Sequence, residues 1–353
     1  MGEYAHELAA ALGRRLRPPD RLTLFSSSWK DRLEHGRVPG ADALDVRLPV
    51  SVLNAAWHRL EWPPIERFAG AVDIAHSLHP LLMPSRRARQ VITIHDLDFL
   101  DHPERTRAEI RRDYAALAPD HARRADLVVT VSQFTAGEVV RRLGVAPDKI
   151  VVCSPGAPPW APRPGPRPGG PILFMGTLEP RKNVGVLLAA YAELLRRKND
   201  PDPLHPVPEL WLAGSATAGA AEWLQAIAQP PLAGRVKHLG YVQSDRGYDL
   251  YAQASMLVLR SHLEGFGIPA LEAMTVGVPV IVSNRGALPE VTGGAARVLE
   301  PDDVGGFADA MALYLDDDRG AATSAAKHGV MRAQQYSWDA SAAALLDRYR
   351  TLA

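Results

Sequence analysis

MLVLRSHLEGFGIPALEAMTVGVPVIV, residues 256–282, contains a strand, a glycine-containing turn, a helix and a second strand in direct succession. The apolar runs at 256–259 and 278–282 are typical of strands that are buried on both faces of a sheet. Between them, Pro269 favours the start of a helix and Gly277 favours its end. A strand–helix–strand unit with two apolar strands predicts an α/β fold with a parallel sheet.

The same alternation extends through most of the 353 residues. Strands are expected at residues 22–25, 46–48, 72–76, 91–95, 127–132 and 150–153, and then at 172–175, 209–213, 236–239, 256–259, 278–282 and 296–299. Long helical patterns occupy 108–124 and 134–143. We therefore predict two doubly wound, Rossmann-like sheets, each covered by helices on both faces.

Proline and glycine mark the boundary between the two series. Residues 155–171 hold eight prolines and four glycines, which is incompatible with the interior of a helix or strand. We expect a first domain at 1–155, a linker at 156–170 and a second domain at 171–335. Ligands of open parallel sheets bind beyond the carboxyl ends of the strands, so the functional residues are expected there, facing a cleft between the domains.

The bulk composition excludes several classes of protein. With 23% charged residues, 7% aromatic residues and a net charge of zero, nothing favours a nucleic-acid partner. The single cysteine, Cys153, cannot form an internal disulfide and is interpreted as a buried thiol. The polar N-terminus and the absence of a long apolar run predict a cytoplasmic protein. Paired arginines such as Arg14-Arg15 and Arg141-Arg142 fit balanced helix faces; peripheral contact with the inner membrane face is the lesser alternative.

Two carboxylates flank the glycines of the opening stretch. Gly265 and Gly267 let backbone approach a ligand closely, and the helix N-terminus behind them offers N–H groups to phosphate. Glu264 is expected at the strand end and Glu272 in the first helical turn, where each can accept hydrogen bonds from vicinal hydroxyls. The alternative is a tight turn with one solvated glutamate and one favoured by the helix dipole, and the glycine spacing alone favours this alternative.

A basic pair follows another strand. Gly176 comes directly after the strand at 172–175, and Arg181 and Lys182 follow it closely. Fixed cations there would stabilise a departing diphosphate as its bond to a sugar breaks. The alternative, a solvated pair at a helix start, places cations at the unfavourable end of the helix dipole.

Taken together, these strings resemble a known family. Residues 264–280 are similar to the E-x7-E element of family-4 glycosyltransferases, and the similarity extends through 286–291, 174–183 and 212–215. The string at 176–183 resembles bacterial mannosyltransferases of polysaccharide and lipid-oligosaccharide assembly. The resemblance implies the GT-B fold and a retaining, metal-independent transfer of a hexose.

The resemblance also implies roles for individual residues. Glu264 would contact the transferred sugar, Glu272 the ribose hydroxyls and Lys182 the diphosphate. Arg181 would replace an arginine that the family often places directly after the glycine, where Thr177 stands here. The remaining donor-binding residues would be Gly176, Thr177, Gly214, Tyr241, Val242, Gly265, Phe266, Gly267 and Ile268, with Tyr241 and Val242 beside the base.

His95 is the clearest candidate in the first half. It ends the apolar run 91–94, and in related enzymes a histidine here faces the donor sugar, where it can donate to a hydroxyl or help move a proton. A structural histidine at a strand end is the alternative.

Asp96-x-Asp98 is similar to the metal-binding Asp-x-Asp of the other major glycosyltransferase fold, but that fold has a single nucleotide-binding domain. No metal site is therefore expected.

GDP-mannose is the first donor expected from the resemblance, with UDP-glucose or another nucleotide sugar close behind. The acceptor would be a hydroxyl of a glycan or a lipid-linked glycan, and no further cofactor is implied.

A non-catalytic or impaired nucleotide-sugar-binding protein and a GT-B phosphorylase or epimerase are the alternatives. The first of these remains because family members usually open with a strand and a glycine-rich loop, whereas this chain enters a helix directly, so that the first strand is expected to be missing. The family also predicts that the terminal segment 336–353 crosses back to the first domain, with Trp338 as a packing anchor.

Overall fold

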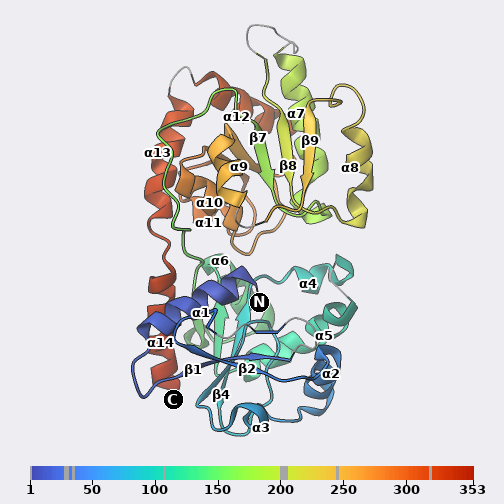
Figure 1. Cartoon of the computed structure of the whole chain (residues 1–353). Coiled ribbons are helices and arrows are strands. Elements are labelled where there is room, and N and C mark those ends of the chain that lie inside the picture. The colour runs from blue at the N-terminus through green and yellow to red at the C-terminus, as the bar shows by residue number, and fades with distance from the viewer. Residues whose placement is uncertain are drawn as a thin grey trace. The chain divides into compact units, whose positions relative to one another are not determined.

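Strands and helices alternate along the chain in the computed structural model, which describes residues 2–27, 32–33, 36–105, 108–198, 206–243, 246–317 and 320–353 (Figure 1). The chain divides into two compact units. The first comprises Met1–Gly156 together with Ser337–Ala353, and the second comprises Ala157–Tyr336. Contacts thus assign residues 157–170, expected as a linker, to the second unit.

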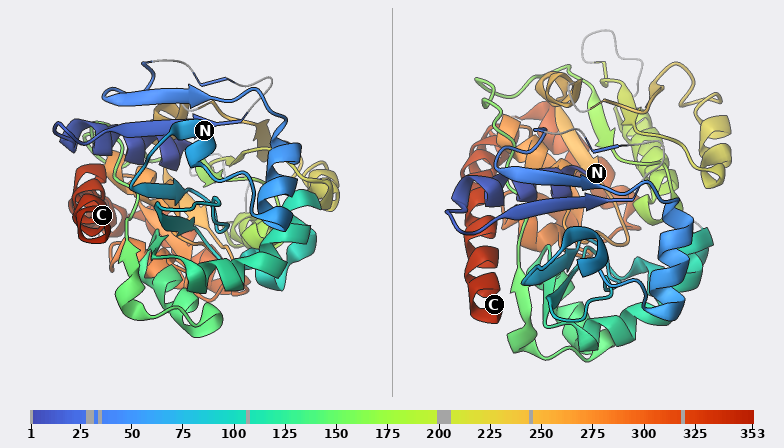
Figure 2. Two further views of the ribbon diagram at one scale, coloured as in Figure 1. Left: turned by 90° about the horizontal axis from the view of Figure 1, so that it is seen from below. Right: turned by 60° about the horizontal axis from the view of Figure 1, so that its bottom comes forward.

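The first unit contains two parallel sheets. One is formed by β1 (Leu22–Ser26) and β2 (Ala41–Asp45), which Figure 2 shows as two adjacent arrows. The other has the order β3-β4-β5-β6, with β3 (Ile74–Ser77), β4 (Arg89–Ile94), β5 (Leu127–Thr130) and β6 (Ile150–Val152). All four residues of β5 are buried, as its uninterrupted apolar pattern predicts.

The helices of the first unit cover these sheets. They are α1 (Glu3–Arg15), α2 (Val50–Leu60), α3 (Glu66–Ala69), α4 (Asp98–Asp101), α5 (Ala108–Arg124), α6 (Gln133–Leu143) and α14 (Trp338–Leu352), with short 3-10 helices at Pro103–Arg105 and Pro147–Lys149. Ser132 caps α6, because its side chain accepts a hydrogen bond from the amide of Thr135.

One strand prediction was wrong. Residues 46–48 were expected as a strand, but the strand is β2, at Ala41–Asp45. Val46 still donates a backbone hydrogen bond to Ser26, but the chain then turns, with the amide of Leu48 bonded to the carbonyl of Val46. Helix α2 begins two residues later, directly after Pro49, so this apolar run serves as the approach to a helix.

No described residue before α1 forms a strand, and the sheet of the first unit is divided between β1 and β3. Helix α1 packs against β2 and also against α14. Tyr4 in α1 donates a hydrogen bond to the carbonyl of Cys153, and its ring meets that of Trp338 edge-on, with 5.3 Å between centroids. Both ends of the chain therefore lie together in the first unit.

The two connections between the units lie next to each other. A Cβ atom on Gly156 would come within 2.4 Å of the amide nitrogen of Trp338, so the chain leaves and re-enters the first unit at one point. In the second unit, the amide of Ala157 donates to the carbonyl of Tyr336 at 3.0 Å. The outgoing and returning segments are thus paired on both sides of the boundary.

The second unit is a single parallel sheet of six strands in the order β12-β11-β10-β7-β8-β9. The strands are β7 (Ile172–Met175), β8 (Leu210–Ala213), β9 (Val236–Gly240), β10 (Met256–Leu259), β11 (Val280–Ser283) and β12 (Arg297–Leu299). After β9 the chain crosses back, so the strand order reverses between β7 and β10. In open α/β sheets this reversal point, at the carboxyl ends of the strands, is where ligands bind.

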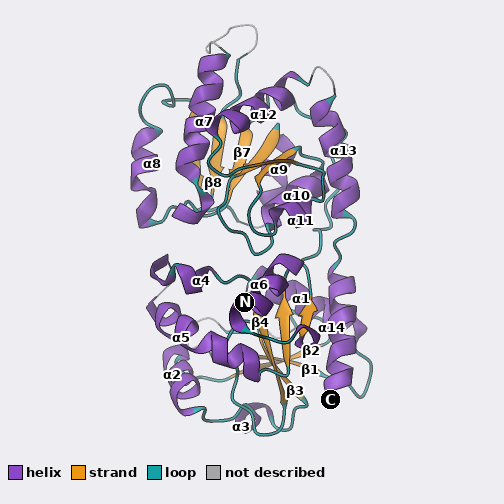
Figure 3. Cartoon of the chain, turned by 180° about the vertical axis from the view of Figure 1, so that it is seen from behind, coloured by secondary structure: helices purple, strands orange, loops and turns teal. Residues whose placement is uncertain are grey.

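Helices cover both faces of that sheet (Figure 3). They are α7 (Val184–Arg197), α8 (Ala221–Ala226), α9 (Gly247–Gln253), α10 (Ile268–Val276), α11 (Leu288–Thr292), α12 (Val304–Asp316) and α13 (Ala321–Ala333), with 3-10 turns at Pro180–Lys182 and Ala218–Ala220. Helix α7 packs against α12, while α10 packs against α9 and α13. In the described part of the chain, no helix combines the length and the apolar character needed to cross a membrane.

Candidate active site

The loop after β7 begins with a close approach of two glycines. Gly176 and Gly214, at the carboxyl ends of β7 and β8, have φ angles of +148° and +145°. A Cβ atom on Gly214 would lie 2.0 Å from the carbonyl oxygen of Gly176. The glycines therefore let two neighbouring loops pass without side chains between them. Thr177 follows with an exposed side chain, and the chain then turns into Pro180–Lys182.

We expect Gly214→Ala to destabilise the protein by about 2–4 kcal/mol, because the new methyl group meets backbone and the φ angle disfavours any residue with a Cβ atom. Gly219→Ala is the matched control, since its nearest contact would be an ordinary 3.6 Å to the ring of Pro180. Urea unfolding of both variants measures the difference. Equal stability of the two variants would contradict this account of the loops.

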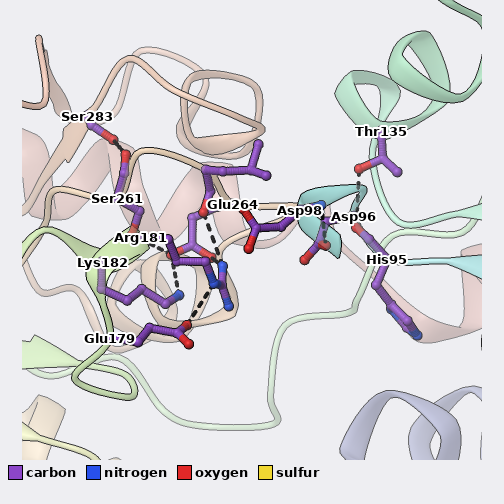
Figure 4. A network of polar contacts seen from close by, with 11 residues as sticks. His95, Asp96, Asp98, Thr135, Glu179, Arg181, Lys182, Ser261, Glu264 and Ser283 are labelled. Atoms are coloured by element: carbon purple, nitrogen blue, oxygen red, sulfur yellow. Dashed lines mark hydrogen bonds and ion pairs between the residues drawn. The ribbon is translucent and has the colours of Figure 1, made fainter. Parts of the chain in front are cut away.

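Lys182 and Glu264 form a buried ion pair at the reversal point of the sheet. Lys182 follows β7 and Glu264 lies in the loop after β10, five residues beyond the end of that strand. Their relative exposures are 7% and 6%, and Lys182 Nζ lies 2.5 Å from Glu264 Oε1. Arg181 approaches the other carboxylate oxygen at 3.6 Å, and its Nε is 2.7 Å from Glu179. Figure 4 shows both basic side chains directed toward Glu264.

Glu264 remains ionised in this environment. Burial alone would raise its pKa, but the charges of Lys182 and Arg181 and the hydrogen bonds from Lys182 and Ser261 outweigh burial and hold the pKa below the ordinary value. Ser261 Oγ donates to the same oxygen as Lys182, at 2.6 Å. The site is therefore a carboxylate held by two cations and a hydroxyl. A diphosphate can pair with the cations, and sugar hydroxyls can donate hydrogen bonds to the carboxylate.

The end of β11 and the loop after it fix the backbone around Glu264. Ser283, at the end of β11, donates to the carbonyl of Ser261 at 2.6 Å (Figure 4). The amide of Ala287 donates to the carbonyl of Glu264 at 2.9 Å. Gly286 lies so close that a Cβ atom there would come within 2.3 Å of that carbonyl oxygen. The loop that carries Glu264 is thus held in place by residues 283–287.

The carbonyl of Pro301 connects the two loops that carry Lys182 and Glu264. It accepts hydrogen bonds from Asn183 Nδ2 at 3.0 Å and from Arg260 Nη2 at 2.5 Å. Asn183 directly follows Lys182 in a left-handed conformation, with φ of +54°. Arg260 is fully buried with its guanidinium 4.2 Å from the centre of the Phe307 ring, and burial lowers its pKa to about 10. The loop after β12, which contains Pro301, thereby fixes the positions of the loops after β7 and β10 relative to each other.

Glu272 lies deeper in its helix than predicted. The sequence placed it in the first turn, but α10 begins at Ile268, so Pro269 is the second helical residue and Glu272 the fifth. The helix begins one residue earlier than expected because Gly267, with φ of +101°, is its N-terminal capping residue. Tyr251 Oη donates to Glu272 Oε2 at 2.6 Å, so this carboxylate belongs to a contact between α9 and α10.

The other predicted donor residues line the same end of the second unit's sheet. Gly265, Phe266 and Gly267 are buried in the loop between β10 and α10, and the ring of Phe266 meets Tyr336 edge-on at 5.4 Å. Tyr241 and Val242 directly follow β9, and Tyr241 is 75% exposed. An exposed aromatic ring at this edge is available to stack on a base. The predicted contacts of these residues with a donor remain predictions.

His95 belongs to the first unit, at the carboxyl end of β4. Its side chain is exposed on one side, while the ring of Tyr4 packs against it edge-on with 4.9 Å between centroids. Desolvation by the surrounding protein lowers its pKa, against the opposing effects of a hydrogen bond with the Leu78 backbone and the charge of Asp96. The imidazole is therefore neutral near pH 7. Its predicted position opposite the donor sugar remains a prediction.

Asp96 and Asp98 have structural partners. The carboxylate of Asp96 accepts a hydrogen bond from the amide of Asp98 at 3.1 Å, which closes a turn at the start of α4 (Figure 4). Asp98 is largely buried. Among the residues whose placement is described, no three histidine, cysteine or acidic side chains come together as metal ligands. Metal independence of the reaction stays a prediction.

Comparison with known proteins places the chain in a family. The family model "Glycosyl transferases group 1" matches residues 168–329, and "Glycosyltransferase Family 4" matches residues 1–160. O-antigen chain mannosyltransferase B of Escherichia coli is 32% identical over 287 residues, which cover 76% of this chain and 72% of that protein. The chain belongs to glycosyltransferase family 4. It is therefore a sugar-transferring enzyme, and the family predicted from its motifs is confirmed.

Solved structures of glycosyltransferases confirm the predicted α/β, GT-B fold. Sucrose-phosphate synthase from Thermosynechococcus elongatus matches with a TM-score of 0.74 and 20% identity, covering 99% of this chain and 92% of that one. HepE from Anabaena, in complex with UDP and glucose, matches with a TM-score of 0.71 and 18% identity, covering 99% and 95%. At such identities the likeness concerns the fold.

Several residues that shape this glycosyltransferase's site were not identified from the sequence. They are Ser261, Ser283, Asn183, Arg260 and Tyr251. Arg260, Ser261 and Ser283 lie at or just after the carboxyl ends of β10 and β11, so the rule that selected Lys182 and Glu264 also applies to them. Asn183 and Tyr251 act through partners remote in sequence, which no local pattern reveals.

Two partly buried histidines of the first unit predict a loss of stability in acid. Burial lowers the pKa of His76 to about 3, aided by nearby His95 and His79, and lowers that of His79 to about 4. His76 lies between the hydroxyls of Tyr349, at 2.5 Å, and Thr93, at 2.8 Å. In the unfolded chain these histidines titrate near pH 6.5, so between about pH 6.5 and pH 3–4 the unfolded state binds more protons.

The free energy of unfolding is therefore expected to fall as pH decreases through this window, by up to about 1.4 kcal/mol per pH unit for each histidine. Urea unfolding at about pH 7, 6 and 5 measures the slope. His76→Gln, which cannot titrate, should show a shallower slope than the wild-type protein. A wild-type stability that stays constant or rises on acidification would show that these rings are not held neutral.

Proposed function

We propose that this glycosyltransferase moves a hexose, with mannose as the first choice, from a nucleoside-diphosphate sugar to an acceptor hydroxyl, with retention and without a metal ion. The observation that carries the proposal is the buried cluster of Lys182, Arg181 and Glu264 at the reversal point of the second unit's sheet. Two cations at the end of parallel strands suit a diphosphate, and a carboxylate beside them suits sugar hydroxyls.

Donor binding exchanges the partners within this cluster. The diphosphate takes the positive charges of Lys182 and Arg181, and Glu264 then accepts hydrogen bonds from hydroxyls of the sugar. As the bond between the anomeric carbon and the phosphate oxygen breaks, the two cations stabilise the charge that develops on the leaving group. The acceptor oxygen bonds to the anomeric carbon from the same face, and its proton passes to the departing phosphate. No covalent intermediate with the protein is required.

The name of the Escherichia coli relative supports mannose as the transferred sugar and a growing glycan chain as the acceptor. The UDP and glucose bound to HepE support a uridine donor as the second choice. The base would lie beside Tyr241, which is exposed after β9. Both donors would use the same diphosphate-binding cluster. The choice between them would therefore depend on which base the edge at Tyr241 accepts and which sugar the loop that carries Glu264 accepts.

Calorimetry with GDP, UDP and ADP, each with and without a chelator of divalent cations, tests donor and metal together. We expect one nucleotide to bind with the same affinity under both conditions, and GDP is the first candidate. The corresponding nucleotide sugar should then yield a product whose anomeric configuration by NMR is that of the donor. Binding of none of the three nucleotides, loss of binding with chelator, or an inverted product would each refute the corresponding part of the proposal.

A further inference from the structure

The contact between helices α9 and α10 is made by a buried tyrosine and a glutamate. Tyr251 has no exposed surface, and its hydroxyl donates to Glu272 Oε2 at 2.6 Å. A hydroxyl–carboxylate bond of this length is charge-assisted and stronger than a neutral hydrogen bond. It fixes the position of one carboxylate oxygen and, with it, the plane of the whole group.

A short segment before β7 holds both helices in place. This strap, residues 160–163, lies in the region expected to be a linker. Its Trp160 ring packs against those of Tyr251 and Tyr248, each with 5.9 Å between centroids. Trp160 also lies 3.4 Å from the position that a Cβ atom on Gly247 would occupy, at the start of α9. Aromatic packing thus immobilises the ring that carries the donating hydroxyl.

Arg163 of the strap binds the carboxyl ends of both helices. Its Nη1 donates to the carbonyl of Ala254 after α9, at 2.5 Å, and its Nε donates to the carbonyl of Gly277 after α10, at 3.3 Å. Its backbone amide donates to Val276, at 2.9 Å. A cation at two helix C-termini satisfies carbonyls that have no partner within the helices and interacts favourably with both dipoles.

We infer that Tyr251 is a positioning residue that orients Glu272 toward the ribose of the nucleotide, and that the strap serves to hold this pair. The inference rests on the proposed function, in which Glu272 accepts hydrogen bonds from the ribose hydroxyls. Orienting the carboxylate in advance removes the entropic cost of ordering it when the nucleotide binds. The strap thereby makes a segment outside the sheet part of nucleotide recognition.

Tyr251→Phe removes only the donating hydroxyl and keeps the ring that Trp160 packs against. Calorimetry compares the variant with wild-type protein for three ligands: the nucleoside diphosphate that wild-type protein binds (GDP first, then UDP), its 2′,3′-dideoxy form, and inorganic pyrophosphate. We expect the affinity for the nucleoside diphosphate to fall about three- to tenfold, while the affinities for the other two ligands stay unchanged. Tyr191→Phe is the matched control, because it removes a buried hydroxyl of the same unit that donates to the carbonyl of Pro208, away from the strap, and it should leave all three affinities unchanged.

The outcomes separate this inference from the proposed function. If wild-type protein binds no nucleoside diphosphate, the proposed function fails and the inference fails with it. If it binds one and Tyr251→Phe binds it equally well, only the inference is overturned. An equal loss for the dideoxy nucleotide or for pyrophosphate would likewise overturn the inference, because it would show that the hydroxyl maintains the whole site and not the contact with ribose.

Discussion

Lys182→Met is expected to reduce sugar transfer by about 10²–10³-fold, the effect typical of removing one group that stabilises developing charge. Methionine keeps the length and the apolar stem of lysine but cannot neutralise a diphosphate. Lys182 is 7% exposed and lies 2.5 Å from Glu264, so water cannot readily replace its charge. The loss should appear in kcat as well as in the affinity for the nucleotide, because the leaving group needs the charge most in the transition state.

Transfer of labelled mannose from GDP-mannose to a lipid-linked glycan measures this effect, with UDP-glucose as the second donor. Lys198→Met is the matched control, because Lys198 lies in the same unit and pairs with Asp316 near the surface. It should retain wild-type activity. If Lys182→Met transferred sugar as fast as Lys198→Met, Lys182 would not contact the leaving diphosphate.

Glu264→Gln should abolish most transfer, by at least about 100-fold, while nucleotide binding is retained or becomes tighter. In the ligand-free protein Glu264 competes with a diphosphate for Lys182 and Arg181, and a bound nucleotide without a sugar would leave the buried carboxylate short of partners. The neutral amide removes this competition. The same amide lacks the charge that strengthens hydrogen bonds from sugar hydroxyls, so the sugar is positioned less well.

The two effects are read from one variant by two measurements, nucleotide affinity by calorimetry and initial rate of transfer. Glu300→Gln serves as the control, since Glu300 is exposed and pairs with Arg285 outside the cluster. Full transfer activity in Glu264→Gln would remove Glu264 from the site. A large loss of nucleotide affinity would show instead that the carboxylate helps to build the phosphate site and does not compete with it.

Central strands of the larger sheets are predictable because they are buried on both faces. Leu127–Thr130 and Met256–Leu259 are apolar throughout or nearly so, and every residue in them is buried. Ala41–Asp45 is not predictable in this way. Three of its five residues are alanine or leucine, the other two are aspartates, and none is fully buried, so the more apolar run that follows it was chosen wrongly.

The candidate site, too, is predictable from the sequence only in part. Lys182 and Glu264 could be selected from the sequence because both follow strands and both lie in strings typical of the family. Their direct ion pair could not be predicted, because it requires β7 and β10 to be neighbours in the sheet although 80 residues, 176–255, lie between the two strands in the chain. Tyr251 was missed for a related reason: its sequence neighbours suggest an ordinary buried helix residue, and only the packing of α9 against α10 brings it to Glu272.

Because the chain returns to its first unit, a single cut in the gene does not separate the two units of this enzyme. Residues 157–336 form one continuous stretch, whereas the first unit is encoded by two stretches separated by the whole of the second. In architecture, the second unit is an insertion between Gly156 and Ser337 of the first unit. A gene cut at the boundary would deprive Tyr4 and His76 of Trp338 and Tyr349. Because Gly156 already adjoins Trp338, a short spacer joining Gly156 to Ser337 is the natural way to produce the first half alone.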